Sequence, residues 1–498
     1  MTTQQITAMA RTANLACPDR LFIDGRWQAP SSRATIDVTD SGTGDLFARV
    51  AEAQAEDIDR AVTAARTAFD KGPWPRMTPA ERAVYLARIG EEFERRAADI
   101  APIWTCESGM VFSASSASAP YTGRTFGFYA GLAESFPFEE KRQSINAPAG
   151  ILVREPVGVV AAIIPWNGAA SLLGWKCAPA LLAGCTVVLK ASPEAPGAAL
   201  IFAEICEKVG LPAGVVNVLT ADREVSELLV RHPGIDKVTF TGSTAAGQRI
   251  ASICGERVAR CTLELGGKSA AIVFDDYDLA AAAATISEQA RFLTGQVCCA
   301  LTRVVVPRNR HDAFVDALTA AFGATKVGDP FDPATEMGPL AMARQRDRVA
   351  DCVARGKAEG AQLVLGGGRP RHLDRGYFFE PTVFANVDNA ATIAREEISG
   401  PVLAVIPVED EAEAVAVAND SVYGLNASVY TRDPDRAYAA ARQLRTGTVG
   451  HNAQRFDHTI AFGGFKQSGL GREGGSEGIL PFLEVKTVLL EDWPAHLR

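Results

Sequence analysis

A cysteine and a glutamate, each in a stretch containing glycine, have the clearest potential for chemistry in this chain. Cys298 lies in Gly295-Gln296-Val297-Cys298-Cys299, and Glu264 lies 34 positions earlier, in Glu264-Leu265-Gly266-Gly267-Lys268. A thiolate attacks a carbonyl carbon, and a carboxylate activates water as a general base. Together the two groups supply what is needed to make a thioester and then to hydrolyse it.

The composition indicates a soluble protein of more than one domain. The chain has 498 residues, of which 47% are apolar and 22% are charged. Single hydrophobic cores stop growing near about 250 to 300 residues, so we expect at least two domains. The net charge of -9 and the lack of a Lys/Arg block argue against a nucleic-acid partner.

Neither a membrane segment nor a secretory signal is visible. The most apolar run, 157–165, is shorter than the roughly 20 residues of a membrane span and is typical of a buried strand. The N-terminus is polar through Gln5, so the cytoplasm is the expected location. The ten cysteines have no paired CxxC spacing, which favours reduced core thiols and no metal site.

Short β-prone runs alternate with Ala-rich helical stretches, which predicts an α/β fold with doubly wound parallel sheets. In the first part we expect strands at 157–164, 186–189, 215–219 and 237–241, with a helix at 195–209 among them. After Glu264 the alternation resumes, with expected strands at 270–274 and 303–307 and helices at 279–292 and 311–322. Two α/β domains should therefore meet near 261–268.

Two extended segments fit neither domain. The stretches 144–155 and 482–490 are β-prone and have no obvious helical partner. They are expected to pair with each other or with another subunit.

A strand, a turn and a helix are expected in succession over 237–247. Gly242 permits the tight turn, Ser243 can cap the helix and donate to a phosphate, and the helix N-terminus offers free N–H groups to an anion. On its own such a turn is structural more often than it binds a dinucleotide.

Two further strand ends carry polar side chains. Lys190 closes one strand, where it can hold ribose hydroxyls or a 2′-phosphate, or simply be solvated. Asn167 follows Pro165-Trp166 at the end of another, where its carboxamide can donate to an oxyanion or merely form a turn.

Taken together, these motifs resemble the aldehyde dehydrogenase superfamily in family order, over about residues 20–490. The motifs that carry the resemblance are Pro165-Trp166-Asn167, Lys190, Phe240-Thr241-Gly242-Ser243, Glu264-Leu265-Gly266-Gly267-Lys268, Gly295-Gln296-Val297-Cys298, Glu397-Ile398-Ser399-Gly400-Pro401, 419–425 and Phe462-Gly463-Gly464-Phe465-Lys466.

The resemblance implies a subunit of three parts. These are a Rossmann-like NAD(P)-binding domain over 1–134 and 157–265, an α/β catalytic domain over 266–467, and a β oligomerisation arm over 135–156 and 468–498. A homodimer or homotetramer is then expected.

The resemblance also implies the roles of individual residues. Cys298 attacks the aldehyde, Asn167 and the Cys298 N–H hold the oxyanion, hydride passes to the nicotinamide, and Glu264 activates the water that releases a carboxylic acid. Lys176 is expected to support catalysis. The cofactor should lie along Ile163, Pro165, Trp166, Lys190, Ser192, Pro193, Thr241, Gly242, Ser243, Gly247, Leu265, Gln345 and Glu397.

Cys299 is an alternative nucleophile. The family motif places the reactive thiol third after Gly295, which favours Cys298 and leaves Cys299 in the wall of the aldehyde pocket. The vicinal thiols can also be redox-reactive or simply packed.

Three positions depart from the usual family pattern. Pro193 stands where many NAD-specific members carry a glutamate that repels a 2′-phosphate, and Glu194 follows it, so we expect NAD with NADP tolerated. Ser399 replaces a phenylalanine beside the nicotinamide, and Gly168 replaces one in the aldehyde channel.

The expected pocket is broad and apolar, which suits a bulky aromatic, terpenoid or medium-chain aldehyde. Its predicted wall consists of Gly168, Leu172, Trp175, Phe292, Cys299 and Phe462. The alternative is a semialdehyde whose carboxylate is anchored by Arg455, His451 or His458.

Other functions remain as alternatives. CoA-acylating relatives typically lack the hydrolytic glutamate that stands here as Glu264, so the free acid is the expected product. A non-catalytic homologue would be expected to lose Cys298, Glu264 or Asn167, and an esterase side activity through Cys298 is chemically feasible.

Overall fold

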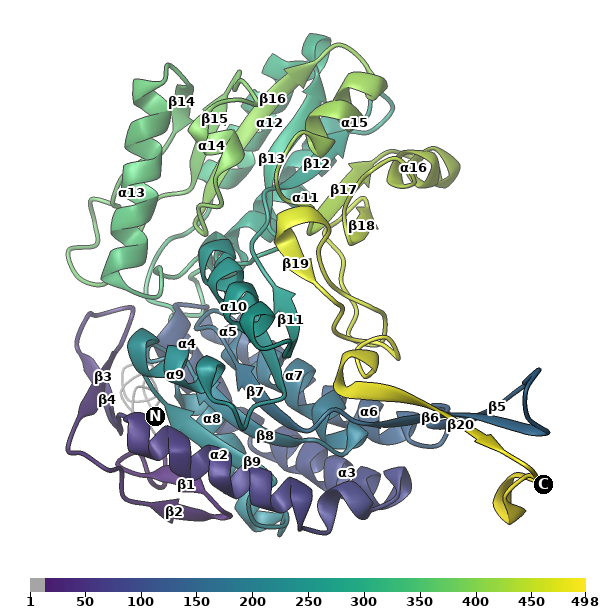
Figure 1. Cartoon of the computed structure of the whole chain (residues 1–498). Helices are drawn as coiled ribbons and strands as arrows, with labels where there is room; N and C mark the ends of the chain where they lie inside the picture. The colour runs from purple at the N-terminus through teal and green to yellow at the C-terminus, as the bar shows by residue number, and fades with distance from the viewer. Residues whose placement is uncertain (1–13) are drawn as a thin grey trace.

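The computed structural model describes residues 14–498, so positions 1–13 of the expected NAD(P)-binding domain, with the polar N-terminus, lie outside the described residues. Two large sheets dominate it (Figure 1). The first has eight strands in the order β19 (Gly469–Leu470), β11 (Arg260–Glu264), β10 (Lys237–Thr241), β7 (Val159–Ile163), β8 (Thr186–Ala191), β9 (Val216–Thr220), β1 (Leu21–Ile23) and β2 (Arg26–Gln28). The five central strands, β11 to β9, run parallel, as predicted for a Rossmann-like sheet.

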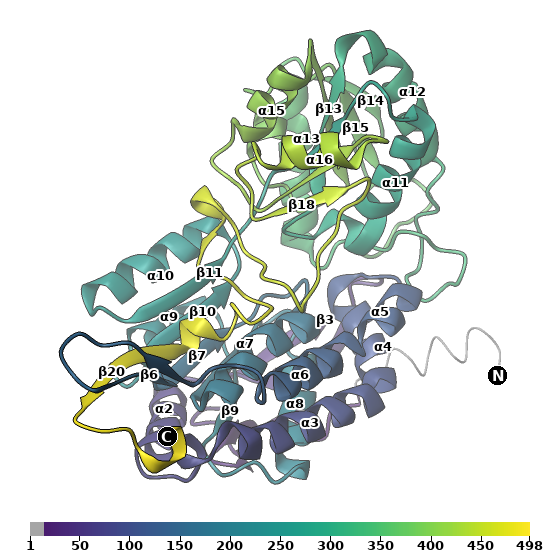
Figure 2. The ribbon, with the colours of Figure 1, turned by 90° about the vertical axis from the view of Figure 1, so that its right-hand side faces the viewer.

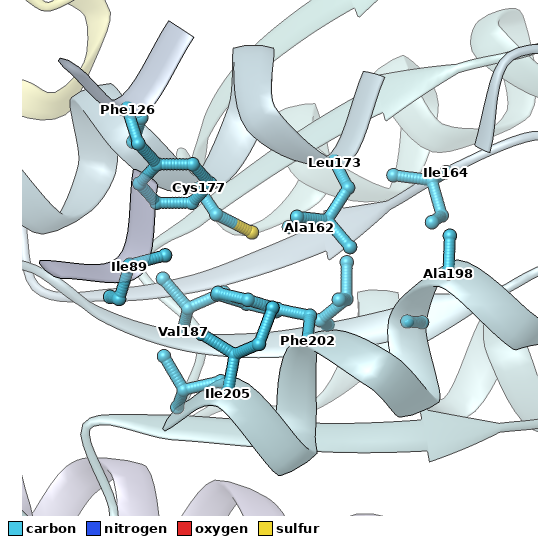
Figure 3. Close-up of a cluster of buried hydrophobic side chains, with 14 of the residues drawn as sticks. Ile89, Phe126, Ala162, Ile164, Leu173, Cys177, Val187, Ala198, Phe202 and Ile205 are labelled. Atoms are coloured by element: carbon cyan, nitrogen blue, oxygen red, sulfur yellow. The ribbon is translucent and has the colours of Figure 1, made fainter. Parts of the chain in front are cut away.

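Both faces of the first sheet are covered because its strands are apolar on both sides. Helices α3 (Pro79–Arg95), α4 (Ala97–Ser108), α6 (Tyr121–Leu132), α7 (Ala169–Ala183) and α8 (Gly197–Lys208) cover one face. Figure 3 shows Cys177 of α7 and Phe202 of α8 in this core with Ala162 and Val187 of the sheet. Helices α2 (Ala55–Asp70), α9 (Arg223–Arg231) and α10 (Thr244–Glu256) cover the other face.

The second sheet has seven strands, of which only β14 runs antiparallel to its neighbour. Their order is β14 (Gln362–Leu365), β15 (Thr382–Ala385), β16 (Val402–Val408), β13 (Leu301–Pro307), β12 (Ser269–Val273), β17 (Asn426–Tyr430) and β18 (Thr448–His451). Helices α11 (Leu279–Arg291) and α12 (His311–Gly323) pack on one face. The other face carries α13 (Ala343–Ala358), α14 (Thr392–Arg395), α15 (Glu411–Asn419) and α16 (Pro434–Ala441).

A three-stranded sheet extends from the body of the molecule (Figures 1 and 2). It contains β5 (Glu139–Arg142), β6 (Ala149–Pro156) and β20 (Leu483–Leu490), and β20 pairs with β6 over its whole length, from Leu483 with Pro156 to Leu490 with Ala149. The two extended segments therefore pair within one subunit. The remaining elements are a β3 (Thr35–Thr39) and β4 (Leu46–Ala51) hairpin, α5 (Phe112–Ser118) and the short helices η1 (Trp74–Arg76), η2 (Phe292–Gly295), η3 (Arg308–Arg310), η4 (Lys466–Ser468), η5 (Leu480–Phe482) and η6 (Ala495–Leu497).

The chain passes from the first large sheet to the second between Glu264, the last residue of β11, and Ser269, the first of β12. Strand β19 returns from the C-terminal part to pair antiparallel with β11, with Gly469 opposite Glu264. The loop 265–268 thus lies at the junction of the two sheets, and the carboxylate of Glu264 is presented there.

Candidate active site

Glu264 is a buried carboxyl group with no hydrogen-bond partner for either oxygen among residues 14–498. Gly463 packs against it so closely that a Cβ there would lie 2.7 Å from Oε1. Burial raises the pKa of Glu264 well above its usual value, the nearby Glu473 adds to this, and Lys176 and Arg472 oppose it. A carboxylate whose pKa is raised is a stronger base than a free carboxylate, which suits proton transfer from a water molecule.

The backbone that leads to Cys298 is held in an unusual conformation. Leu293 and Thr294 adopt left-handed φ angles of 49° and 55°, which are strained for residues with side chains. The Thr294 hydroxyl donates to the carbonyls of Gly338 and Pro339 at 3.0 and 3.1 Å. These bonds fix the turn and hence the position of the thiol.

Asn167 lies beside the Cys298 loop. Its Nδ2 donates to the Gln296 carbonyl at 2.8 Å, and the Trp104 indole donates to the Asn167 carbonyl at 3.1 Å. A carboxamide has two N–H bonds, so the second remains for an oxyanion formed at Cys298.

Glu264 and Cys298 are brought together by the glycines between the sheets. A Cβ on Gly267 would lie 2.7 Å from the carbonyl oxygen of Cys298. The loop that follows Glu264 therefore packs directly on the backbone of Cys298, and the stretches that carry Cys298, Asn167 and Glu264 lie together.

Lys176 is fully buried on α7 and forms an ion pair with Glu473, with Nζ and Oε1 2.6 Å apart. Thr239 of β10 donates to the same oxygen at 3.2 Å. The pairing compensates the cost of burying both charges. Lys176 therefore acts on Glu264 through its charge, which opposes the rise in the pKa of Glu264 that Glu473 promotes.

The predicted cofactor residues at the ends of β7 and β8 share one edge of the first sheet, since Ile163 is in register with Lys190. Pro165 and Trp166 follow Ile163 directly. Burial lowers the pKa of Lys190 to about 8, while Glu194 and Asp222 oppose the shift. An ammonium group in such a place gains from an anionic or hydroxyl-bearing ligand.

Glu194 is already engaged. It accepts from the hydroxyl of Ser192 and pairs with Arg344 near the start of α13. The negative charge of Glu194 is therefore compensated by Arg344, which belongs to the part of the chain that forms the second large sheet. The preceding Pro193 carries no charge of its own.

At the end of β10, the buried Thr241 hydroxyl has no hydrogen-bond partner among the described residues. Ser243 caps α10, because its Oγ accepts from the Ala246 N–H at 3.3 Å. Gly247 packs on Leu265 so tightly that a Cβ would lie 2.4 Å from the Leu265 side chain. The structure thus gives Ser243 a capping role and Gly247 a packing role.

Glu397 lies over Gly266, where a Cβ would overlap Oε2 at 1.6 Å. Burial raises the pKa of Glu397 to about 7, while the Ser399 hydroxyl, which donates to it at 3.1 Å, opposes the shift. Gln345 donates to the carbonyls of Ile398 and Ser399 at 2.9 and 2.7 Å. In this structure Gln345 therefore fixes the loop that carries Glu397.

Only some of the predicted pocket-wall residues lie in contact with one another. Trp175 and Phe462 meet edge to face with ring centroids 5.3 Å apart. Leu172 leans on Gly168, where an added Cβ would lie 3.3 Å from it, so part of the space left by the glycine is already filled. Phe292 differs from these residues because 41% of its side chain is exposed.

The three residues considered as anchors for a substrate carboxylate, His451, His458 and Arg455, differ in their charge and in their contacts. His451 contacts the Thr431 carbonyl through Nε2 at 3.0 Å. Burial lowers the pKa of His458, which packs on Tyr121 and Phe128, so burial disfavours a positive charge on this ring. Arg455 is exposed and brings a permanent positive charge to this loop, which also carries the carboxylate of Asp457.

Three residues of the site were missed by sequence reasoning. Glu473, Trp104 and Gln454, whose Nε2 donates to Cys299 Sγ at 3.0 Å, lie in stretches without a recognisable motif. The only local signal is that Gln454 lies in the loop before Phe462.

Within residues 14–498, no helix is long and apolar enough to cross a membrane, and no cluster of three or more His, Cys, Asp or Glu side chains is placed to hold a metal ion.

Comparison with known proteins gives a consistent result. The model of the aldehyde dehydrogenase family matches residues 27–488. The chain is 44% identical to geranial dehydrogenase of Castellaniella defragrans over 94% of this chain and 98% of that protein. It is 42% identical to 3-succinoylsemialdehyde-pyridine dehydrogenase of a Pseudomonas species, with the same coverage. A crystal structure of a Mycobacterium tuberculosis aldehyde dehydrogenase with NAD+ superposes with a TM-score of 0.93 at 45% identity, over 96% of this chain and 99% of that one.

Proposed function

The chain belongs to the aldehyde dehydrogenase family, and we propose from this premise that it oxidises a bulky, apolar aldehyde to the carboxylic acid with NAD+. The observation that carries the proposal is the meeting of Cys298, Asn167 and Glu264, through the packing of Gly267 on the Cys298 carbonyl. A nucleophile, an oxyanion donor and a general base within one buried site are the parts that acyl transfer needs.

The first half of the reaction forms an acyl-enzyme. The Cys298 sulfur attacks the carbonyl carbon, and the resulting oxyanion accepts hydrogen bonds from Asn167 Nδ2 and the Cys298 backbone N–H. NAD+, when bound, accepts the hydride that leaves this carbon. The fixed turn at 293–295 keeps the thiol in place during the attack.

The second half hydrolyses the thioester. Glu264 takes a proton from a water molecule, and the hydroxide attacks the acyl carbon and expels the Cys298 thiolate. The charges of the Lys176–Glu473 ion pair act in opposite directions on the pKa of Glu264 and so influence how readily it takes up this proton. Because Glu264 is present, the product is the free acid and not a CoA ester.

The residues at the strand ends of the first sheet fit a dinucleotide. Lys190 and the Thr241 hydroxyl are buried polar groups on β8 and β10, the two strands that flank β7. Glu397 is a half-buried acceptor suited to ribose hydroxyls. Neither Pro193 nor the paired Glu194 provides a free charge against a 2′-phosphate. We therefore assign NAD as the cofactor, with NADP tolerated.

The apolar substrate class is supported by the contact of Trp175 with Phe462 and by the name of the geranial dehydrogenase relative. The second candidate is a semialdehyde. It is favoured by the exposed Arg455 in the loop before Phe462 and by the name of the Pseudomonas relative.

A kinetic panel tests the proposal. We expect kcat/KM for citral, benzaldehyde or octanal to exceed that for succinic semialdehyde by about tenfold or more, because an apolar wall leaves a carboxylate unpaired. NAD should be preferred modestly over NADP, and Pro193→Glu should lower kcat/KM for NADP while sparing NAD. A panel led by succinic semialdehyde, or a strong preference for NADP, would contradict these assignments.

A homo-oligomer also forms part of the proposal, with the three-stranded sheet as the arm. The supporting observation is that its strand β20 exposes Val485 and Leu489. We assign 1–134 and 157–265 to NAD(P) binding, 266–467 to catalysis, and 135–156 with 468–498 to assembly.

A further inference from the structure

An ion pair joins Glu194, which follows strand β8, to Arg344 in the first turn of α13. The two residues lie 150 positions apart and belong to the parts of the chain that form the first and the second large sheet. Only 17% of the Glu194 side chain is exposed, whereas 65% of the Arg344 side chain is. A largely buried carboxylate of the first sheet is therefore paired with an arginine that solvent and ligands can still reach.

Glu194 occupies the position of a ribose acceptor in a dinucleotide-binding sheet. Strands β7 and β8 run parallel and are joined by α7, which makes a β-α-β unit. After the second strand of such a unit, an acidic residue accepts from ribose hydroxyls in NAD-binding proteins, and a nearby arginine accommodates the 2′-phosphate in NADP-binding ones. Glu194 also accepts from the Ser192 hydroxyl. Burial lowers the pKa of Lys190 to about 8, and the charge of Glu194 opposes that shift, so Glu194, Ser192 and Lys190 form one polar group at the end of β8.

Arg344 adds to this group a positive charge with spare hydrogen-bond donors. A guanidinium has five N–H groups in a fixed plane and keeps its charge at all physiological pH values. Among residues 14–498, the Arg344 side chain bonds only to Glu194, through Nη2. The remaining N–H groups suit a phosphate, whose oxygens arginine binds in pairs, and the N-terminus of α13 adds partial positive charge beside them.

We propose that Arg344 determines the cofactor specificity of this chain, because it balances the charge of Glu194 and donates to the 2′-phosphate of NADP(H). The inference rests on the proposed function, since it requires a dinucleotide at the end of β8. With NAD(H), Glu194 accepts from the ribose hydroxyls while its charge is balanced by Arg344. With NADP(H), the spare N–H groups of Arg344 bind the phosphate, and Ser192 and Lys190 are further donors. An unpaired Glu194 would repel the phosphate, and the ion pair removes that repulsion.

Two nucleotide fragments test the proposal without any aldehyde turnover. Adenosine 2′,5′-bisphosphate carries the 2′-phosphate of NADP, and 5′-AMP lacks it. The full-length protein is titrated with each fragment by calorimetry. Arg344→Gln should raise the ratio of the bisphosphate Kd to the 5′-AMP Kd by about tenfold to a hundredfold, the usual contribution of hydrogen bonds between charged groups. Arg344→Lys keeps the charge but not the planar fork, so its ratio should lie between those of the wild type and Arg344→Gln.

Glu194→Gln separates phosphate recognition from a purely structural bridge. Glutamine keeps an acceptor for the ribose hydroxyls but removes the negative charge, so this variant should lower the Kd for the bisphosphate, opposite to Arg344→Gln. A bridge that only held the two sheets together would be lost in both variants, and both would then weaken the two fragments alike. The matched control is Arg346→Gln on the same helix, whose guanidinium bonds to Asp347 at 3.0 and 2.8 Å, and it should follow the wild type.

The outcomes are distinguishable. If Arg344→Gln keeps the wild-type ratio of the two Kd values, or if Arg344→Gln and Glu194→Gln weaken the bisphosphate equally, Arg344 does not recognise the phosphate, although the chain can still use NAD. A wild type that binds 5′-AMP but not the bisphosphate overturns the inference in the same way. If the wild type binds neither fragment and no NAD+, the proposed function itself is wrong.

Discussion

Single residues in this site work in surroundings that disfavour charge. Glu264 and Glu473 are buried near each other, with Lys176 ion-paired to Glu473, and Glu397 is half-buried over Gly266. The pKa values of Glu264 and Glu397 are raised chiefly by burial. A carboxylate with a raised pKa is a stronger base, which suits general-base catalysis.

Glu264→Gln should stop the reaction after acylation, because the amide cannot accept a proton from water. Mixing the variant with NAD+ and octanal should give one burst of NADH and a stable adduct on Cys298, seen by intact mass. In the wild type, hydrolysis should slow as the pH falls, since Glu264 must be ionised to act and its pKa is raised by burial.

The matched control is Glu288→Gln, a change of the same kind at an exposed position on α11. This variant should keep producing NADH after the first turnover, like the wild type. Absence of any adduct in Glu264→Gln would show that Glu264 is not the hydrolytic base.

Cys298, Asn167 and Glu264 could be singled out from the sequence because short local motifs surround each of them. Glu473 could not, because its role depends on a contact with Lys176 across 297 positions of the chain. The contact of Gln454 with Cys299 spans 155 positions in the same way. A single sequence contains no physical signal for such pairings until the fold brings them together.

Among the secondary-structure elements, α4 and α8 contact each other through a buried carboxyl group. Glu107 of α4 accepts from the Gly197 N–H at the start of α8 at 2.9 Å. A Cβ on Gly197 would lie 2.3 Å from Ile103 and 2.9 Å from Glu107 Oε1, so the close approach requires glycine. Burial raises the pKa of Glu107 to about 8, while the Gly197 hydrogen bond opposes the shift.

Glu107→Gln should therefore stabilise the protein near and above neutral pH. The folded-state pKa lies above the unfolded one, so the stability that protonated Glu107 contributes is complete below about pH 4.5 and is lost as the pH rises to about 8. Glutamine keeps an acceptor for Gly197 and does not titrate. Melting curves should show a Tm advantage of the variant that grows between about pH 5 and 8.

Glu107→Ala provides the comparison. It leaves the Gly197 N–H without a partner and opens a cavity, so it should lower the Tm at every pH. A Tm difference between Glu107→Gln and the wild type that is the same at pH 5 and pH 8 would contradict the assigned protonation.

The central strands could be predicted because they are continuous apolar runs. The expected ranges 186–189 and 237–241 correspond to β8 (Thr186–Ala191) and β10 (Lys237–Thr241). The edges of the first sheet could not be predicted, since β2 and β19 are only three and two residues long and come from opposite ends of the chain. The partner of β20 was left open by the sequence, because a β-prone run does not specify what it pairs with.

The molecule as a whole presents an arm that its own body does not cover (Figure 2). On it, Ile145, Val485 and Leu489 are exposed apolar side chains, with Ile145 at 96% exposure. Apolar groups gathered on a projecting sheet usually mark an interface.

The double change Val485→Lys with Leu489→Lys should reduce the assembly size, because it places charge where a partner subunit would pack. Light scattering coupled to size exclusion should report a mass above that of one 52.8 kDa chain for the wild type and a smaller mass for the variant. Val84→Lys, at an exposed position on α3, is the control and should keep the wild-type mass. A wild type that elutes as a monomer would refute the assembly.

The pairing of Lys176 with Glu473, and of β11 with β19, has a consequence for biosynthesis. On a translating ribosome, most of the first sheet has emerged long before residues 469–473, so Lys176 has no counter-charge and β11 has an open edge. The surroundings of the catalytic carboxylate are completed only when this late segment arrives. A polypeptide released early therefore carries Cys298 while Glu264 still lacks the neighbouring charges and the strand that surround it in the folded chain.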